Sequence, residues 1–196
     1  MWKPKSLTYI LAVIWIIVKL IFFYADISIS RFGDIVTLNF GFILFIIYNA
    51  LQRYYKSDDA NKYNFLDDFK VALKEAIRYI VVIFVFLLAY YSFIEPEAKE
   101  KWAVHKKTEQ IESLGGYDEY LDEIIRINEA QGGEPISKDD YAKTQEEHLE
   151  FIRKDVKEQV PNLLFTSAIL LGLFFMACAL SGIGAAIFKF FMKNIK

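Results

Sequence analysis

The chain has 196 residues, of which 55% are hydrophobic and 24% are charged, with 23 basic and 25 acidic side chains. So many charges cannot be spread evenly through a membrane protein, and they must be segregated from the apolar residues. The single cysteine, Cys178, excludes a disulfide framework within the chain and is expected to be a small packing residue.

Four apolar stretches have the length of a membrane-spanning helix. Charged residues become sparse in Leu7–Tyr24, Ile35–Leu51, Tyr79–Ile94 and Leu163–Phe188. A helix needs about 20 apolar residues to cross the hydrocarbon core of a bilayer. The run Ile80–Leu88 is apolar on every face, whereas strands of a membrane barrel alternate apolar and polar residues. The sequence therefore predicts an all-α fold built on a four-helix transmembrane bundle, with an uncleaved first span.

Basic residues near the ends of the spans predict the orientation of the chain, because lysine and arginine in short loops favour the cytoplasmic side. The link between the first two spans, residues 25–34, contains one basic residue, Arg31. The basic residues on the other side are Lys3, Lys5, Arg53, Lys56, Lys62, Lys70, Lys74, Arg78, Lys189, Lys193 and Lys196. We therefore expect a multi-pass protein of a bacterial inner membrane, with both termini in the cytoplasm.

Residues 1–94 contain three spans and, before the third, an amphipathic segment at residues 64–78. Charged residues occupy several faces of this segment, and large apolar residues recur every four positions at Phe65, Phe69, Leu73 and Ile77. We expect a helix that lies along the cytoplasmic membrane surface and leads into span three. A helix that docks on a partner protein has a similar pattern and is the alternative.

Residues 95–160 form a polar, acidic insert between the third and fourth spans, with 18 acidic and 10 basic residues. Composition and glycine pairs predict helices over Glu97–Leu114 and Tyr117–Gln131. A third helix is expected to start at Ser137, with Asp140 three positions later.

The predicted structure of the insert is a periplasmic helical hairpin that continues spans three and four outward as an antiparallel pair. Its mixed charges are typical of a solvated helical surface, and docking against a basic partner is the alternative. Residues 161–196 then form span four and a basic cytoplasmic tail.

Span four carries small residues at four-residue spacing, a pattern that lets two membrane helices approach closely. One series is Ala168 and Gly172, and the other is Ala177, Ser181 and Ala185. We interpret these residues as a helix-packing face. Contact with another span of this chain is favoured, and contact with a second protein is the alternative.

A few polar residues lie inside spans one and two, namely Lys19, Thr37, Asn39 and Asn49. An ionisable group within a membrane is costly, which makes Lys19 a candidate for contact with a substrate or a lipid headgroup. The favoured alternative is structural, because a lysine near the membrane surface can extend its amine to water or pair with Asp26 or Asp34. The polar residues of span two are expected to form hydrogen bonds between helices.

No short motif in the sequence matches a phosphate-binding loop, a zinc peptidase or a serine hydrolase. The two histidines, His105 and His148, both lie in the insert, and a metal site needs more ligands than they supply. We therefore expect solvated or packed histidines, and no catalytic, cofactor or metal site.

The arrangement of the chain resembles the DUF4199 family, membrane proteins of unknown function from Bacteroidetes. The resemblance is carried by two N-terminal spans, the entry to span three at Phe65–Leu73, the charged insert, and a glycine-containing last span that ends in Lys193 and Lys196. It implies no catalytic residues. It does imply a gene neighbourhood that often holds a family-2 glycosyltransferase acting on a polyprenyl-phosphate carrier, and hence an accessory role.

Two functions fit these features. The first is a non-enzymatic accessory or scaffold subunit of an inner-membrane complex, with the lipid bilayer and a membrane protein as partners, no nucleic acid, and self-association left open. The second is a small transporter or lipid-handling protein that uses Lys19 and the polar residues of span two. An enzyme ranks third, because no recognisable motif supplies its site.

Overall fold

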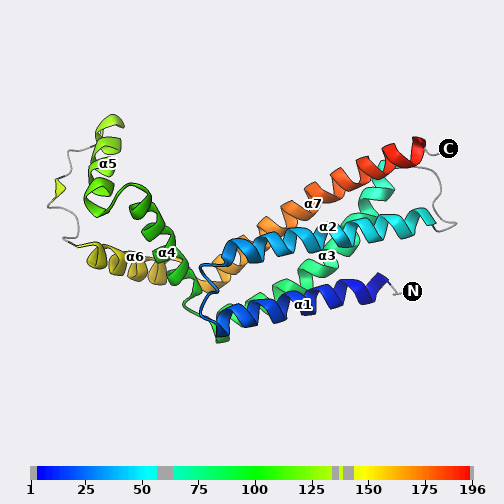
Figure 1. Ribbon diagram of the computed structural model, residues 1–196, viewed down its shortest axis with the longest axis horizontal. Helices are drawn as coiled ribbons and strands as arrows, with labels where there is room; N and C mark the ends of the chain where they lie inside the picture. The colour runs from blue at the N-terminus through cyan, green and yellow to red at the C-terminus, as the bar shows by residue number, and fades with distance from the viewer. Residues whose placement is uncertain (1–3, 57–63, 134–136, 139–143, 195–196) are drawn as a thin grey trace. The chain divides into compact units, whose positions relative to one another are not determined.

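The computed structural model describes residues 4–56, 64–133, 137–138 and 144–194. The elements are α1 (Pro4–Tyr24), α2 (Phe32–Lys56), α3 (Phe65–Ala89), the π-helical turn η1 (Tyr90–Ile94), α4 (Ala98–Ser113), α5 (Tyr117–Ala130), α6 (Gln145–Gln159) and α7 (Asn162–Asn194) (Figure 1). Within the described ranges the regular structure is helical, as the sequence predicts. Lys3, Lys62 and Lys196 of the orientation prediction, and Asp140 of the predicted helix start, lie outside those ranges.

Among the described residues, four helices are long and apolar enough to cross a membrane, which matches the number of spans expected from the sequence. The candidate spans are Leu7–Tyr24, Phe32–Lys56, Phe65–Ile94 and Asn162–Phe190. The chain divides into two compact units. We call Met1–Tyr90 with Thr166–Lys196 the span unit, and Tyr91–Phe165 the insert unit.

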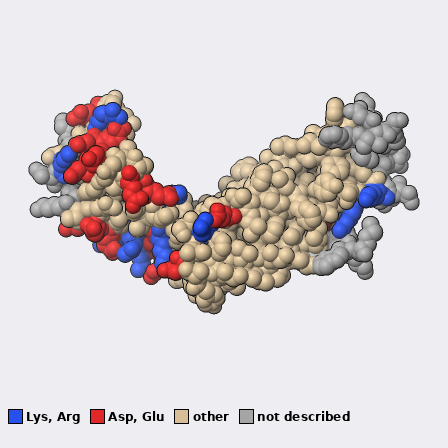
Figure 2. Space-filling model, viewed as in Figure 1, with Lys and Arg blue, Asp and Glu red and all other residues tan. Residues whose placement is uncertain are grey.

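In the span unit, α3 packs against both α1 and α2, and α2 also contacts α1. α1 begins and α7 ends at the same end of this unit (Figure 1). The unit exposes many large apolar side chains, including Ile17, Val85 and Phe175. Charged side chains are distributed unevenly. In Figure 2 the surface of the long helices is almost free of charge, while acidic and basic side chains gather over α4, α5 and α6. Such extensive apolar surface fits contact with lipid.

The structure has one unbroken helix, α3, where the sequence predicts a surface helix at residues 64–78 followed by a span. Asn64 caps its start, because the Asn64 side chain accepts a hydrogen bond from the Leu66 N–H at 3.2 Å. The buried stripe of α3 consists of Asp68, Ala72, Ala76, Tyr79, Ile80, Ile83 and Leu87. The series that begins at Phe65 lies on a less buried face, since the small Ala72 and Ala76 allow a closer approach to the neighbouring helices.

The end of α3 passes into η1 just before Pro96, which lacks a backbone N–H and so cannot continue the helical hydrogen bonds. The carbonyl of Tyr91 instead accepts a hydrogen bond from the side-chain amide of Asn162 at 3.0 Å. Asn162 is the first residue of α7. This hydrogen bond therefore connects the segment that enters the insert unit with the segment that leaves it.

In the insert unit, α4 packs against α6 and α5. The two longer helices run antiparallel, because Lys99 near the start of α4 contacts Val160 after the end of α6, while Ile111 and Leu149 share a small core at the other end. Buried Tyr120 and Leu121 of α5 complete that core. The turn between α4 and α5 needs glycine, because Gly115 and Gly116 have φ of 106° and 139°.

The helix α6 starts later than the sequence predicts. Its N-cap is Thr144, whose hydroxyl accepts a hydrogen bond from the Glu147 N–H at 3.2 Å. Thr144 has an extended backbone, with φ of −131° and ψ of 156°, so no unbroken helix runs from Ser137 into α6. Residues 139–143, on which the rest of the predicted start falls, lie outside the described ranges. Ser137 and Thr144 both have a hydroxyl followed three residues later by an acid, and the local pattern alone cannot choose between them.

Candidate functional site

The most unusual residue of the span unit is Lys19 in α1, which is only 2% exposed. Its amine lies 4.7 Å from the centre of the Tyr90 ring. Tyr90 also contacts the rings of Phe23 and Phe86. A cation over an aromatic face is stabilised by the ring's quadrupole, and more strongly away from water. Of the two acids that the sequence offers as partners, Asp34 pairs with Arg31 at 3.2 Å.

Asn39 of α2 forms a hydrogen bond between helices. Its side-chain oxygen accepts from the hydroxyl of Tyr79 in α3 at 2.6 Å, and both residues are buried. Thr37 and Asn49 instead donate to carbonyls of their own helix, at 2.9 and 2.8 Å. Among these polar residues of span two, Asn39 is therefore the one placed to hold α2 and α3 in register.

A second buried contact joins α2 and α3 through Asp68, which is fully buried. The hydroxyl of Tyr55 donates to one Asp68 carboxylate oxygen at 2.6 Å. The other oxygen, Oδ1, is buried and has no hydrogen-bond partner within the described ranges. The Tyr55 ring also stacks on Phe188 of α7. Asp68 therefore lies close to the place where three helices meet.

The two series of small residues in α7 lie in different surroundings. Ala177, Ser181 and Ala185 are fully buried. Ala168 and Gly172 are exposed, and a Cβ added at Gly172 would meet no atom within 4 Å. Contact with α2 is made at Gly184, where an added Cβ would lie 2.9 Å from Ile47. The described residues thus cover one part of the predicted packing face, the series at Ala177, and leave the part at Ala168 and Gly172 exposed.

The insert unit contains a buried charged pair near the start of α4. Lys99 and Glu100 are 7% and 5% exposed, and the Lys99 amine lies 4.0 Å from Glu100 Oε1. Lys99 donates hydrogen bonds to the backbone carbonyls of Lys157 and Val160. These carbonyls belong to the C-terminal end of α6, where a cation is favourable. Lys99 therefore ties the start of α4 to the end of α6.

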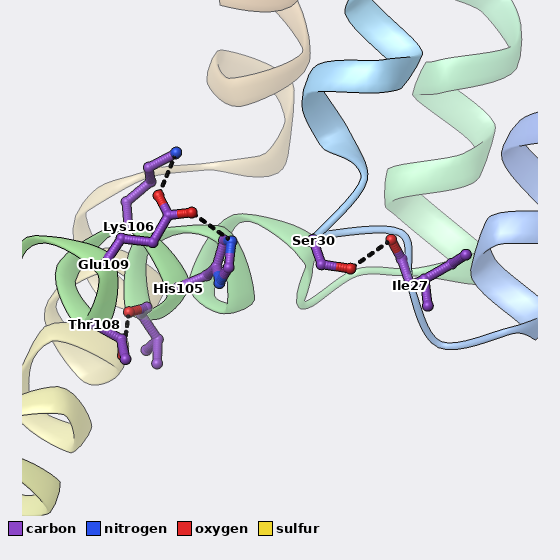
Figure 3. Close-up of polar contacts among 7 residues, drawn as sticks. Ile27, Ser30, His105, Lys106, Thr108 and Glu109 are labelled. Atoms are coloured by element: carbon purple, nitrogen blue, oxygen red, sulfur yellow. Dashed lines mark hydrogen bonds and ion pairs between the residues drawn. The ribbon is translucent and has the colours of Figure 1, made fainter. Parts of the chain in front are cut away.

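The two histidines occupy different environments. His105 contacts Glu109 at 3.2 Å, and the hydrogen bond that Lys106 donates to Glu109 lowers the pKa of that carboxyl (Figure 3). His148 packs on the rings of Tyr117 and Tyr120, and burial lowers its pKa. The described residues contain no group of three or more side chains placed to hold a metal ion.

Sequence reasoning missed the residues that pair with the predicted ones. Tyr79 and Tyr90 belong to an apolar run, in which a tyrosine gives no sign of its partner. In the predicted surface helix, Asp68 falls on a different face from the apolar series that begins at Phe65, which gives no sign that it is buried. Lys99 and Glu100 looked like ordinary charges of a solvated helix. The one available signal was position, because Asp68, Ala72 and Ala76 share a helical face.

No curated protein and no solved structure matches the sequence. The family described as protein of unknown function (DUF4199) matches residues 8–189. This match extends from the first span to the end of the fourth and includes the whole insert unit. The chain therefore belongs to the DUF4199 family.

Proposed function

We propose that the protein is a non-enzymatic accessory or scaffold subunit of a membrane protein complex, and that span four is its docking element. The observation that carries this proposal is the low coverage of α7. In its apolar stretch 22% of the residues are buried, compared with 39% in α2. The exposed pair Ala168 and Gly172 adds a small-residue face, which allows a second helix to approach closely in a bilayer.

The proposed setting is the inner membrane of a bacterium of the Bacteroidetes. The basic residues near the span ends support cytoplasmic termini and a periplasmic helical hairpin at residues 95–160, between spans three and four. The gene neighbourhood implied by the family resemblance makes a polyprenyl-phosphate glycosyltransferase the first partner to test.

The test is to purify the tagged chain in mild detergent and to identify the membrane proteins that co-purify with it. The wild type, Gly172→Leu and Gly41→Leu are compared. Gly41 is a matched control, because it is also an exposed glycine of a span whose added Cβ would meet no atom within 4 Å. We expect the wild type and Gly41→Leu to retain the same membrane protein partner and Gly172→Leu to lose it. Purification of the wild type as a lone monomer would contradict the proposal.

A second function is favoured by the burial of Lys19 against Tyr90. A small transporter or lipid-handling protein would use the buried amine to contact an anionic group. In that case Lys19→Ala abolishes a transport or lipid phenotype at an unchanged protein level, while Lys19→Arg retains part of it. A neutral Lys19→Ala variant would leave Lys19 with a structural role.

A further inference from the structure

The insert unit contains a charged cleft between the start of α4 and the end of α6. The cleft has a volume of about 240 Å³ and is lined by Glu97, Glu100, Lys101, Arg153 and Lys157. A shallower depression of about 490 Å³ adjoins it, shares three of these residues and reaches Pro96, Lys99 and Asn162. Pockets for drug-sized ligands measure roughly 300–1,000 Å³. The cleft therefore suits a small polar group rather than a large molecule.

The acidic side of the cleft has an unused hydrogen-bond acceptor. Glu100 is 5% exposed, and its Oε2 is buried without a hydrogen-bond partner in the part of the chain that the structure describes. Glu97 is the N-cap residue of α4, and its side chain makes no capping hydrogen bond. A buried carboxylate oxygen without a donor costs free energy. Glu100 Oε2 is therefore an acceptor for which no described residue supplies a donor.

The basic side of the cleft is formed by three cations that keep much of their capacity to donate hydrogen bonds. Lys101 is 3.9 Å from Glu95, and Arg153 pairs with Glu150 of its own helix at 2.9 Å. Lys157 has no ion pair with another described residue. Guanidinium and ammonium groups bind phosphate well, since phosphate accepts several charge-assisted hydrogen bonds. The positions of both sides are held by Lys99, which joins the two helices.

We propose that this cleft binds a group in which a phosphate and a primary ammonium are linked by a short chain, with the ammonium on Glu100 and Glu97 and the phosphate on Lys157, Arg153 and Lys101. This chemistry occurs in phosphoethanolamine, both as a lipid headgroup and as a soluble compound. The cleft residues all lie within nine positions of the end of span three or the start of span four in the chain. A membrane lipid is therefore the source that connectivity favours.

The experiment measures lipid binding to the full-length protein in mild detergent by native mass spectrometry. The probes are phosphatidylethanolamine and phosphatidylcholine with identical acyl chains. Both carry the same phosphate and net charge, but the quaternary ammonium of choline has no N–H to donate to Glu100. We expect the wild type to prefer the ethanolamine lipid about tenfold, which corresponds to about 1.4 kcal/mol.

Two variants separate the two sides of the cleft. Glu100→Gln should remove the preference for the ethanolamine lipid. Lys157→Gln should weaken the binding of both lipids to a similar extent. Glu112→Gln and Lys154→Gln are matched controls, because they make the same charge changes at exposed positions of the same two helices. Equal binding of the two lipids by the wild type, or a preference that survives Glu100→Gln, would overturn the proposal.

A competition arm distinguishes the two sources of the ligand. Displacement of the lipid by excess soluble phosphoethanolamine supports a site for the free compound as well, and retention of the lipid supports a lipid site. If Glu100→Gln fails to fold, the exposed Lys157 still decides the matter, since lipid binding by Lys157→Gln equal to that of Lys154→Gln contradicts the proposal. Because none of these measurements uses the proposed partner, this result is independent of the docking of span four.

Discussion

At the scale of single residues, the span unit is organised by polar side chains that are buried and paired across helices. Tyr79 reaches Asn39, Tyr55 reaches Asp68, and the amine of Lys19 lies against Tyr90. In a bilayer a polar group has no water to bond with, so each such residue favours one arrangement of the helices in which its partner is present. These pairs therefore specify helix register more than they add stability.

Replacement of Tyr79 by Phe removes the hydroxyl that donates to Asn39 and leaves a buried amide oxygen without its donor. We expect the free energy of unfolding to fall by about 1 kcal/mol, within the roughly 0.6–2 kcal/mol measured for hydrogen bonds between membrane helices. The measurement is unfolding in mixed micelles. Asn39→Leu in the Tyr79→Phe background should cost little more, and additive losses would show that the two groups are not coupled.

Acidification should lower the stability of the insert unit, because His148 becomes protonated. Burial, followed by the charge of Lys107, lowers the pKa of His148 from its ordinary 6.5, so the folded unit binds the proton less tightly than the unfolded chain. This contribution to stability is complete above about pH 6.5 and is lost as the pH falls through and below that value.

Hydrogen exchange of α5 and α6 amides between pH 7.5 and 5.5, corrected for the intrinsic effect of pH, measures the change. We expect protection to fall with pH in the wild type and to stay nearly constant in His148→Gln. His105→Gln is the matched control and should behave like the wild type. The same pH response in His148→Gln would assign it to other groups.

At the scale of helices, close approach depends on small residues at a few positions. α3 buries Ala72 and Ala76 against its neighbours, and α7 meets α2 at Gly184. Large apolar residues of the same helices point outward and remain exposed. This is the reverse of a water-soluble protein, because lipid solvates apolar side chains and tight packing becomes the main source of helix association.

Gly184→Ala should weaken the contact between α7 and α2, because the added Cβ would lie 2.9 Å from Ile47 and 3.5 Å from Leu51. Overpacking costs about 1–3 kcal/mol, and the higher helix propensity of alanine returns about 1 kcal/mol. We expect a net loss of up to about 2 kcal/mol in micelle unfolding. Gly182→Ala, where the added Cβ meets nothing, should be neutral or stabilising. Equal behaviour of the two variants would contradict the packing at Gly184.

At the scale of the whole molecule, the distribution of charge predicts the side of the membrane on which the insert unit and the C-terminus lie. Acidic and basic side chains gather over α4, α5 and α6, while the visible surface of the long helices is almost free of charge (Figure 2). A reporter active only in the cytoplasm should work when it is fused after the C-terminus and be silent when it is inserted at Gly132. The reverse pattern would invert the proposed topology.

The amino-acid sequence by itself determined the number of spans, their helical state and the polar character of the insert. These are local properties, because a backbone in lipid must satisfy its own hydrogen bonds and an apolar run long enough to span has little choice but a helix. The glycine pair that ends α4 is local in the same sense, since Gly115 and Gly116 adopt positive φ.

The tertiary structure decided what each helix faces. It placed Lys19 against Tyr90, paired Asn39 with Tyr79, buried Asp68 rather than the series beginning at Phe65, and covered Ala177 while leaving Gly172 open. The physical reason is rotation about the helix axis. A run that is apolar on every face carries almost no signal for that rotation, which is set by packing between residues far apart in the chain.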